Sequence, residues 1–124
     1  MNIDEMEAGR EMDAMVAEKV MGWERGAVCW MIPNNTPGER IGPLIDEWQP
    51  STDIAAAWEA VEKCLLLGYG LNIRKAFYDE EEDRWYIAVT INLKNKSSSV
   101  ARFTVFDETA PLAICRAALK AVEK

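Results

Sequence analysis

The sequence predicts an α+β fold in which an antiparallel sheet of three to four strands packs with helices as an α-β-α sandwich. Two observations carry this prediction. Three stretches place apolar residues at helical spacing, and between the second and third of them apolar and polar residues alternate as they do in strands. A length of 124 residues is typical of one domain. We therefore expect residues 1–124 to form one unit in the order α-(β)-α-β-β-β-α.

The three helical stretches have recognisable starts. The first covers about residues 4–23, the second follows Pro50, and the third covers about residues 110–122. Proline disfavours helix in the residue before it, and Ser51 or Thr52 offers a side-chain oxygen that could cap the second helix. The apolar stripe expected to be buried on the second helix consists of Ile54, Ala57, Trp58, Val61, Cys64 and Leu65.

The segment between the first two helices has no regular pattern. Residues 27–32 form a short apolar run that predicts a strand, and residues 33–38 form a turn-rich loop. Trp30 and Trp48 lie in this irregular segment. An aromatic side chain in such a place either anchors a partner or covers the edge of the core. Both interpretations stay open, and the two tryptophans are candidate partner-binding residues.

Three strands are expected at about residues 71–78, 85–93 and 100–107, joined by turns short enough for an antiparallel meander. One face of this sheet is polar and aromatic, and serves either as a covered or subunit-facing surface or as a ligand platform. That face carries Asn72, Arg74, Tyr78, Tyr86, Thr90 and Asn92.

The turn between the first two strands is strongly acidic. Its sequence is Asp79, Glu80, Glu81, Glu82 and Asp83. A divalent-cation site is one interpretation, but the run lacks the alternating spacing and central glycine of an EF-hand loop. A solvated hairpin turn is favoured, and its carboxylates are candidate contacts for a basic partner.

The charge balance excludes some partners. Fourteen basic and 21 acidic residues give a formal net charge of −7, and the isoelectric point is about 4.6. Direct binding of nucleic acid or of an anionic membrane needs Lys and Arg on one face, so neither is expected, whereas basic proteins are suitable partners. The chain opens with no leader and has no apolar run of membrane-spanning length, so an intracellular location is expected.

The sequence offers little for catalysis. It contains no histidine, which removes the usual general base and the commonest zinc ligand. Neither a GxxxxGK[ST] nor a GxGxxG string is present. The three cysteines form no C-x-x-C pattern, and two of them, Cys64 and Cys115, fall on apolar helical stripes as buried thiols would. We expect no enzymatic activity, no metal and no cofactor.

Three strings of residues resemble a known family. They are EAGREMD at 7–13 continuing to VMGW at 20–23, STDIAAAW at 51–58, and TAPLAICRAAL at 109–119. Together they are similar to the phage ABA sandwich domain family, small proteins of bacteriophages and prophages, over nearly the whole chain. The resemblance implies an α-β-α sandwich. With the intracellular location expected above, a phage protein would act in the cytoplasm of its bacterial host. The resemblance carries no activity, so it assigns no residue a role.

Three hypotheses for function follow. The first is a phage-encoded, non-enzymatic protein that inhibits an anti-phage defence system by binding a host protein, such as a basic nucleic-acid-binding effector. The second is a binder that sequesters a nucleotide signal, with Arg74, Arg102, Tyr86 or one of the two loop tryptophans holding phosphate and base. The third is a virion or packaging accessory protein that works as a homo-oligomer.

Overall fold

The computed structural model describes residues 3, 6–33, 40–93 and 102–122. The expected turn at 34–38 and the first two residues of the expected third strand lie outside this part. The elements are α1 (Arg10–Met15), η2 (Val16–Val20), β1 (Glu24–Arg25), β2 (Cys29–Ile32), β3 (Arg40–Leu44), α2 (Ile54–Leu66), β4 (Tyr69–Asp79), β5 (Arg84–Leu93), β6 (Arg102–Asp107) and α3 (Ala110–Val122). α1 and η2 form one continuous helix whose last turns are π-helical.

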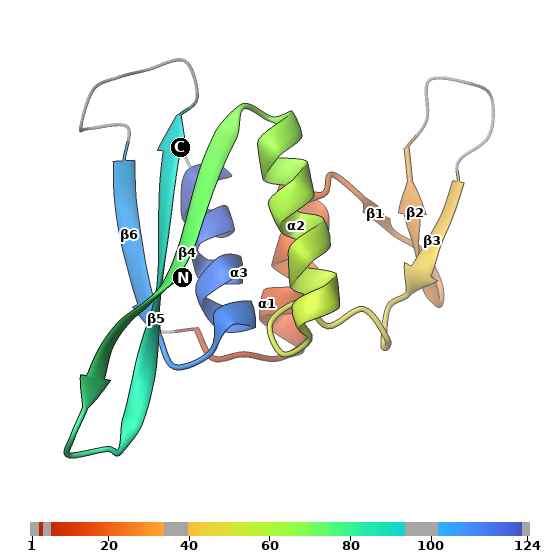
Figure 1. Cartoon of the computed structure of the whole chain (residues 1–124). Helices are drawn as coiled ribbons and strands as arrows, with labels where there is room; N and C mark the ends of the chain where they lie inside the picture. The colour runs from red at the N-terminus through yellow and green to blue at the C-terminus, as the bar shows by residue number, and fades with distance from the viewer. Residues whose placement is uncertain (1–2, 4–5, 34–39, 94–101, 123–124) are drawn as a thin grey trace.

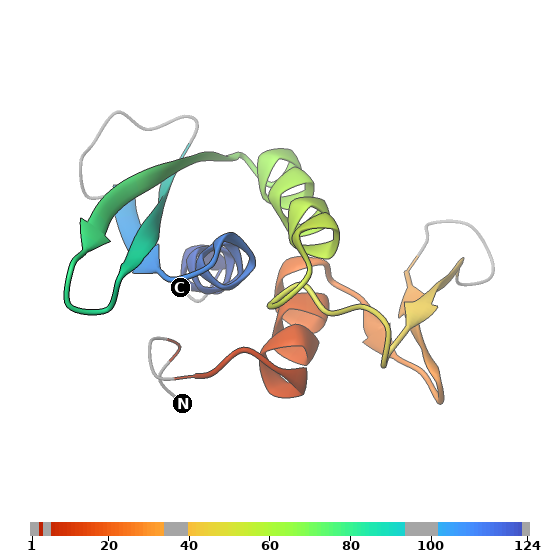
Figure 2. The ribbon, with the colours of Figure 1, turned by 60° about the horizontal axis from the view of Figure 1, so that its bottom comes forward.

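The elements stack in layers, as Figures 1 and 2 show. β4, β5 and β6 form an antiparallel sheet, and α2 and α3 cover one of its faces. The α1–η2 helix packs against these two helices, and β1, β2 and β3 form a second antiparallel sheet beyond it. The α+β class and the antiparallel meander are confirmed. The possible fourth strand, residues 27–32, instead contributes β2 to the separate small sheet.

Small side chains form much of the core between the large sheet and the helices. Val89, Ile91 and Val105 on the inner sheet face are buried against the fully buried Ala113 and Ile114 of α3. Because alanine adds little volume, the helix can lie close to the sheet. A second buried cluster joins α1 and η2 to α2 and α3 and includes Met12, Val16, Val20, Trp30 and Trp48.

The predicted starts of the first and second helices differ from the structure. The first helix begins at Arg10, after Gly9, whose φ of 155° favours glycine. α2 is capped by Asp53, whose side chain accepts a hydrogen bond from the backbone N–H of Ala55 at 3.2 Å. Ser51 does not cap α2, because its N–H donates to Asp13 and its hydroxyl accepts from the backbone of Gly9.

The buried stripe of α2 is also different from the prediction. Ala56, Ala57, Ala60, Val61 and Cys64 are its buried residues. By contrast, Ile54, Trp58 and Leu65 are 50, 51 and 46% exposed. The helix packs against α3, β4 and η2 through its alanines, which turns the larger side chains toward solvent.

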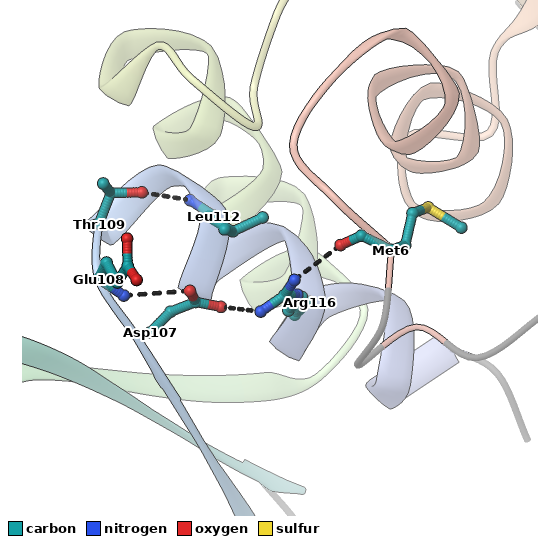
Figure 3. A network of polar contacts seen from close by, with 6 residues as sticks. All are labelled: Met6, Asp107, Glu108, Thr109, Leu112 and Arg116. Carbon is teal, nitrogen blue, oxygen red and sulfur yellow. Dashed lines mark hydrogen bonds and ion pairs between the residues drawn. The ribbon is translucent and has the colours of Figure 1, made fainter.

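Arg116 fastens the N-terminal segment to the end of β6, as Figure 3 shows. Its guanidinium pairs with Asp107 and also donates to the carbonyl oxygen of Met6 at 2.7 Å. Asp107 in turn accepts from the N–H of Glu108 at 3.0 Å. α3 begins beside this network, where the hydroxyl of Thr109 accepts from the N–H of Leu112.

Within the described residues, no helix has the length and apolar character that crossing a membrane would require.

Candidate binding surface

The β4–β5 hairpin reaches beyond the helices, at the lower left of Figure 1. In its body, Lys75 lies opposite Ile87, whereas Phe77 lies opposite Tyr86, so Ala76 is an extra residue in β4. Such a β-bulge reverses which residues of the strand point to each face. Beyond the bulge, Phe77 therefore shares the outer face of the sheet with Tyr86.

Three aromatic rings gather on this outer face. Phe77 and Tyr86 are stacked with ring centroids 4.9 Å apart and planes inclined by 19°. Phe106 of β6 lies 5.9 Å from Phe77, centroid to centroid. Phe77 is 46% exposed and Phe106 is 50% exposed. Among the described elements, the helices all lie on the other side of this sheet (Figures 1 and 2).

The acidic turn closes the same hairpin. Asp79 accepts hydrogen bonds from the backbone N–H groups of Glu81 at 3.0 Å and Glu82 at 3.4 Å, which shapes the turn. Asp83 has a φ of 54°, a left-handed conformation that aspartate tolerates. Glu80 to Asp83 are exposed. The favoured interpretation of this run as a solvated hairpin turn agrees with this geometry.

Carboxylates converge on the hydroxyl of Tyr86. This hydroxyl donates a hydrogen bond to Glu82 at 3.1 Å. That bond, together with the negative charges of Glu82, Glu108 and Asp79, raises the pKa of Tyr86 above its usual value. Glu82 therefore borders the aromatic rings, and the charges of Glu108 and Asp79 are near enough to act on Tyr86. We call this set the aromatic–acidic face; it consists of Phe77, Tyr86, Phe106, Asp79, Glu82 and Glu108.

The sequence anticipated part of this surface. The acidic turn and Tyr86 were candidate site residues, and the structure brings them together. Phe77 and Phe106 were missed. Tyr78, which regular alternation placed beside Tyr86, lies opposite Trp85 instead and so points to the other face. The signal for Phe77 was an aromatic residue two positions before an acidic turn, but the bulge that reorients it leaves no mark in the sequence.

The two loop tryptophans lie in the core. Trp30 is 1% exposed and Trp48 is 5% exposed. The ring of Trp48 packs against Trp23, with centroids 4.7 Å apart, and its N–H donates to Glu59 at 2.5 Å. This burial corresponds to the alternative in which they cover the core edge, and it leaves neither ring facing a macromolecular partner.

The residues considered for nucleotide binding lie in two separate places. Arg74 and Tyr86 share the outer face of the large sheet, because Ala88, opposite Arg74, is the next residue of β5 on the face of Tyr86. Arg74 is exposed there, whereas Trp30 lies in the small sheet on the far side of the helices. Arg102 pairs with Asn92 through the backbone of β6, and its side chain lies outside the described part.

A groove lies between α1, the β1–β2 turn and the segment before α2. Its volume is about 660 Å³. The guanidinium carbon of Arg25 lies 5.0 Å from the ring centroid of Trp30 within its lining. Arg10 and Asp46 form an exposed ion pair between two of its walls. The remaining lining includes the apolar Ala14, Met15, Ala27, Val28 and Ile45.

Among the described residues, no three Cys, Asp or Glu side chains are grouped as metal ligands would be.

The sequence profile of the phage ABA sandwich domain matches residues 14–119, from α1 to α3. The chain belongs to this family. The resemblance to this family is therefore confirmed, although the string at 7–13 lies before the matched span. This phage ABA sandwich domain is also similar to a solved phage protein from Bacillus cereus ATCC 14579. The TM-score is 0.57 and the sequence identity is 25%, over 100% of this chain and 90% of the other. Among curated proteins, none matches.

In this phage ABA sandwich domain, the matched span contains α2, all three strands of the large sheet and all but the last three residues of α3. The aromatic–acidic face is therefore part of the family domain and not an appendage outside it. Both comparisons describe bacteriophage proteins, and neither description states an activity.

Proposed function

We propose that this phage ABA sandwich protein is a non-enzymatic binding protein that modulates a process of its bacterial host, and that this process is an anti-phage defence. The observation that carries the proposal is the aromatic–acidic face. Two of its rings, those of Phe77 and Phe106, are about half exposed on the sheet, and clustered exposed aromatic side chains are a common feature of protein-binding surfaces. We place its action in the host cytoplasm.

The mode of action would be steric. A defence effector that binds nucleic acid carries a basic surface, because phosphate binding needs Lys and Arg. A chain with a net charge of −7 and a carboxylate-bordered aromatic surface is complementary to such a surface. Occupying it would block the effector without chemistry by the phage protein.

The test is a plaquing assay in bacteria that each carry one defined defence system. We expect expression of the wild-type chain to restore plaquing of a sensitive phage by at least about tenfold on one such strain. The variant Phe77→Thr/Phe106→Thr should fail to do so. Threonine suits exposed strand positions, so the fold should be retained, which thermal melting verifies.

The matched control is Trp58→Gln, which removes an equally exposed aromatic ring from α2. It should restore plaquing as well as the wild type. The proposal fails if no strain regains plaquing and if the immobilised wild-type chain retains no host protein at low salt. Detection of the chain in purified virions would favour the accessory-protein hypothesis instead.

A second candidate function is sequestration of a nucleotide signal, and the groove beside α1 favours it. A volume of about 660 Å³ is within the range of small-ligand pockets, and Arg25 in its lining supplies a cation that could pair with a phosphate. Thermal-shift measurements with cyclic mono- and dinucleotides test this function. Stabilisation that is lost in Arg25→Gln would support it, and no shift with any of them would count against it.

A further inference from the structure

The chemistry of the aromatic–acidic face indicates which kind of partner it can bind. Phe77 and Tyr86 are stacked near the end of the hairpin, so each ring covers one face of the other and presents its second face to other contacts. Phe106 of β6 adds a third ring to this cluster, tilted by 49° against Phe77. Flat aromatic surfaces attract cations, because the face of each ring carries negative charge.

The carboxylates reinforce this preference. The hydrogen bond from Tyr86 to Glu82 holds one carboxylate at the edge of the stacked rings. Glu108 follows β6, whose last residue, Asp107, lies opposite Ile87, so it emerges next to Tyr86 on the side away from Phe77. Carboxylates therefore stand on two sides of the same ring pair.

A second copy of this chain fits the surface poorly. Pairing two such faces would bring the same carboxylates together in two molecules that each carry a net charge of −7. Like charges brought together at an interface oppose binding. Nucleic acid is disfavoured for the same reason. The face is complementary to a cationic segment of another protein.

We propose that the aromatic–acidic face binds an arginine-containing basic segment of a partner protein, with a guanidinium stacked on the ring of Phe77 or Tyr86 and paired with Glu82 or Glu108. Arginine fits better than lysine, because its planar guanidinium stacks on aromatic rings and also pairs with a carboxylate through two N–H groups. This inference rests on the proposed function and names the chemistry of its partner.

The experiment uses the full chain and a fluorescently labelled nona-arginine peptide, with nona-lysine and a neutral Gly-Ser peptide as comparison probes. Fluorescence anisotropy gives each dissociation constant at several salt concentrations. We expect nona-arginine to bind about tenfold more tightly than nona-lysine, and the neutral peptide not to bind. Binding should weaken as salt rises, because exposed charges are screened.

Two double variants separate the contribution of the aromatic rings to peptide binding from that of the carboxylates. Phe77→Thr/Phe106→Thr should weaken nona-arginine binding by about tenfold and reduce the preference over nona-lysine. Glu82→Gln/Glu108→Gln should weaken binding of both peptides and flatten the salt dependence. The matched controls, Trp58→Gln for the rings and Glu47→Gln/Glu62→Gln for the charges, alter equally exposed residues elsewhere and should bind as the wild type does.

Three results would overturn the inference: equal binding of the two cationic peptides, equal losses in the face variants and their controls, or no binding at low salt. The two proposals fail separately. If nona-arginine binds as expected while no defence strain regains plaquing, the function is wrong and the partner chemistry stands. If plaquing is restored and depends on Phe77 while neither cationic peptide binds, the partner chemistry is wrong.

Discussion

The carboxylate of Asp13 accepts a hydrogen bond from the backbone N–H of Ser51, 38 residues further along the chain, at 2.8 Å. The hydroxyl of Ser51 accepts from the backbone N–H of Gly9 at 3.0 Å. These bonds join the first turn of α1 to the residues just before α2. Asp13 is only 7% exposed, and this burial raises its pKa above the ordinary value of 3.8.

The raised pKa of Asp13 predicts how stability depends on pH. The folded protein holds this proton more tightly than the unfolded chain does, so the contribution of Asp13 to stability falls as pH rises from below 3.8 through the raised pKa. Asp13→Asn keeps an acceptor for Ser51 and does not titrate. We expect the free energy of unfolding of the variant, minus that of the wild type, to increase across this window. Urea unfolding of both proteins from pH 3 to pH 7 measures it; a difference that does not change with pH would contradict the prediction.

The ion pair between Arg116 and Asp107 should matter to stability. Its side chains are only 16 and 7% exposed, and Arg116 also bonds the carbonyl oxygen of Met6. Arg116→Met leaves the Asp107 carboxylate buried without its cation, which should lower the free energy of unfolding by about 3 kcal/mol. The matched control is Arg10→Met, because the pair of Arg10 with Asp46 is 83 and 74% exposed. This control should cost less than about 1 kcal/mol, as exposed pairs usually do. Similar losses in the two variants by urea unfolding would show that burial is not the reason.

The three thiols should react at different rates. Cys64 and Cys115 are fully buried, and burial raises the pKa of Cys64 to about 11 and that of Cys115 further. The thiolate is the reactive form, so both thiols should be protected in the folded protein at pH 8. Cys29 is partly exposed. Labelling with a thiol reagent, followed by mass spectrometry, should modify Cys29 first and the other two only after unfolding. Equal rates at the three positions would exclude the burial described here.

Removing a buried tryptophan should lower the free energy of unfolding more than removing an exposed one. Trp30→Ala deletes a ring that is 1% exposed, so it should lower the free energy of unfolding by about 3–5 kcal/mol. Trp58→Ala deletes a ring that is 51% exposed and should cost about 1 kcal/mol or less. Chemical unfolding of the two variants gives both values. The reverse order would support the sequence-based expectation that Trp58 belongs to the core.

The sequence pattern predicted β4, β5, β6 and α3 well. α3 begins and ends where the sequence indicated, because Thr109 supplies a cap and Pro111 occupies the first turn. The strands were found by their alternation, with shifts of a few residues at their ends. The errors concern residues whose role depends on distant parts of the chain. Ser51 has the right chemistry for a cap, but its hydrogen bonds go to Asp13 and Gly9.

The candidate site was predicted only in part for the same reason. The acidic turn is contiguous in sequence, so composition revealed it. Phe106 meets Phe77 only because β6 pairs with β5, and Phe77 reaches the outer face only because of the bulge at Ala76. Trp30 lies in an irregular segment, yet its ring is covered by the packing of the small sheet onto η2. Cross-strand register and tertiary packing decide all three positions.

The bulge at Ala76 also affects which substitutions this protein can accept during evolution. Up to Lys75, alternate residues of β4 pack toward the helices, so substitutions there must satisfy the core. Beyond it, the hairpin extends past the helices and its side chains are largely exposed (Figure 1). Substitutions in this outer part cost little stability. The aromatic–acidic face can therefore diverge in sequence while the scaffold that carries it is preserved.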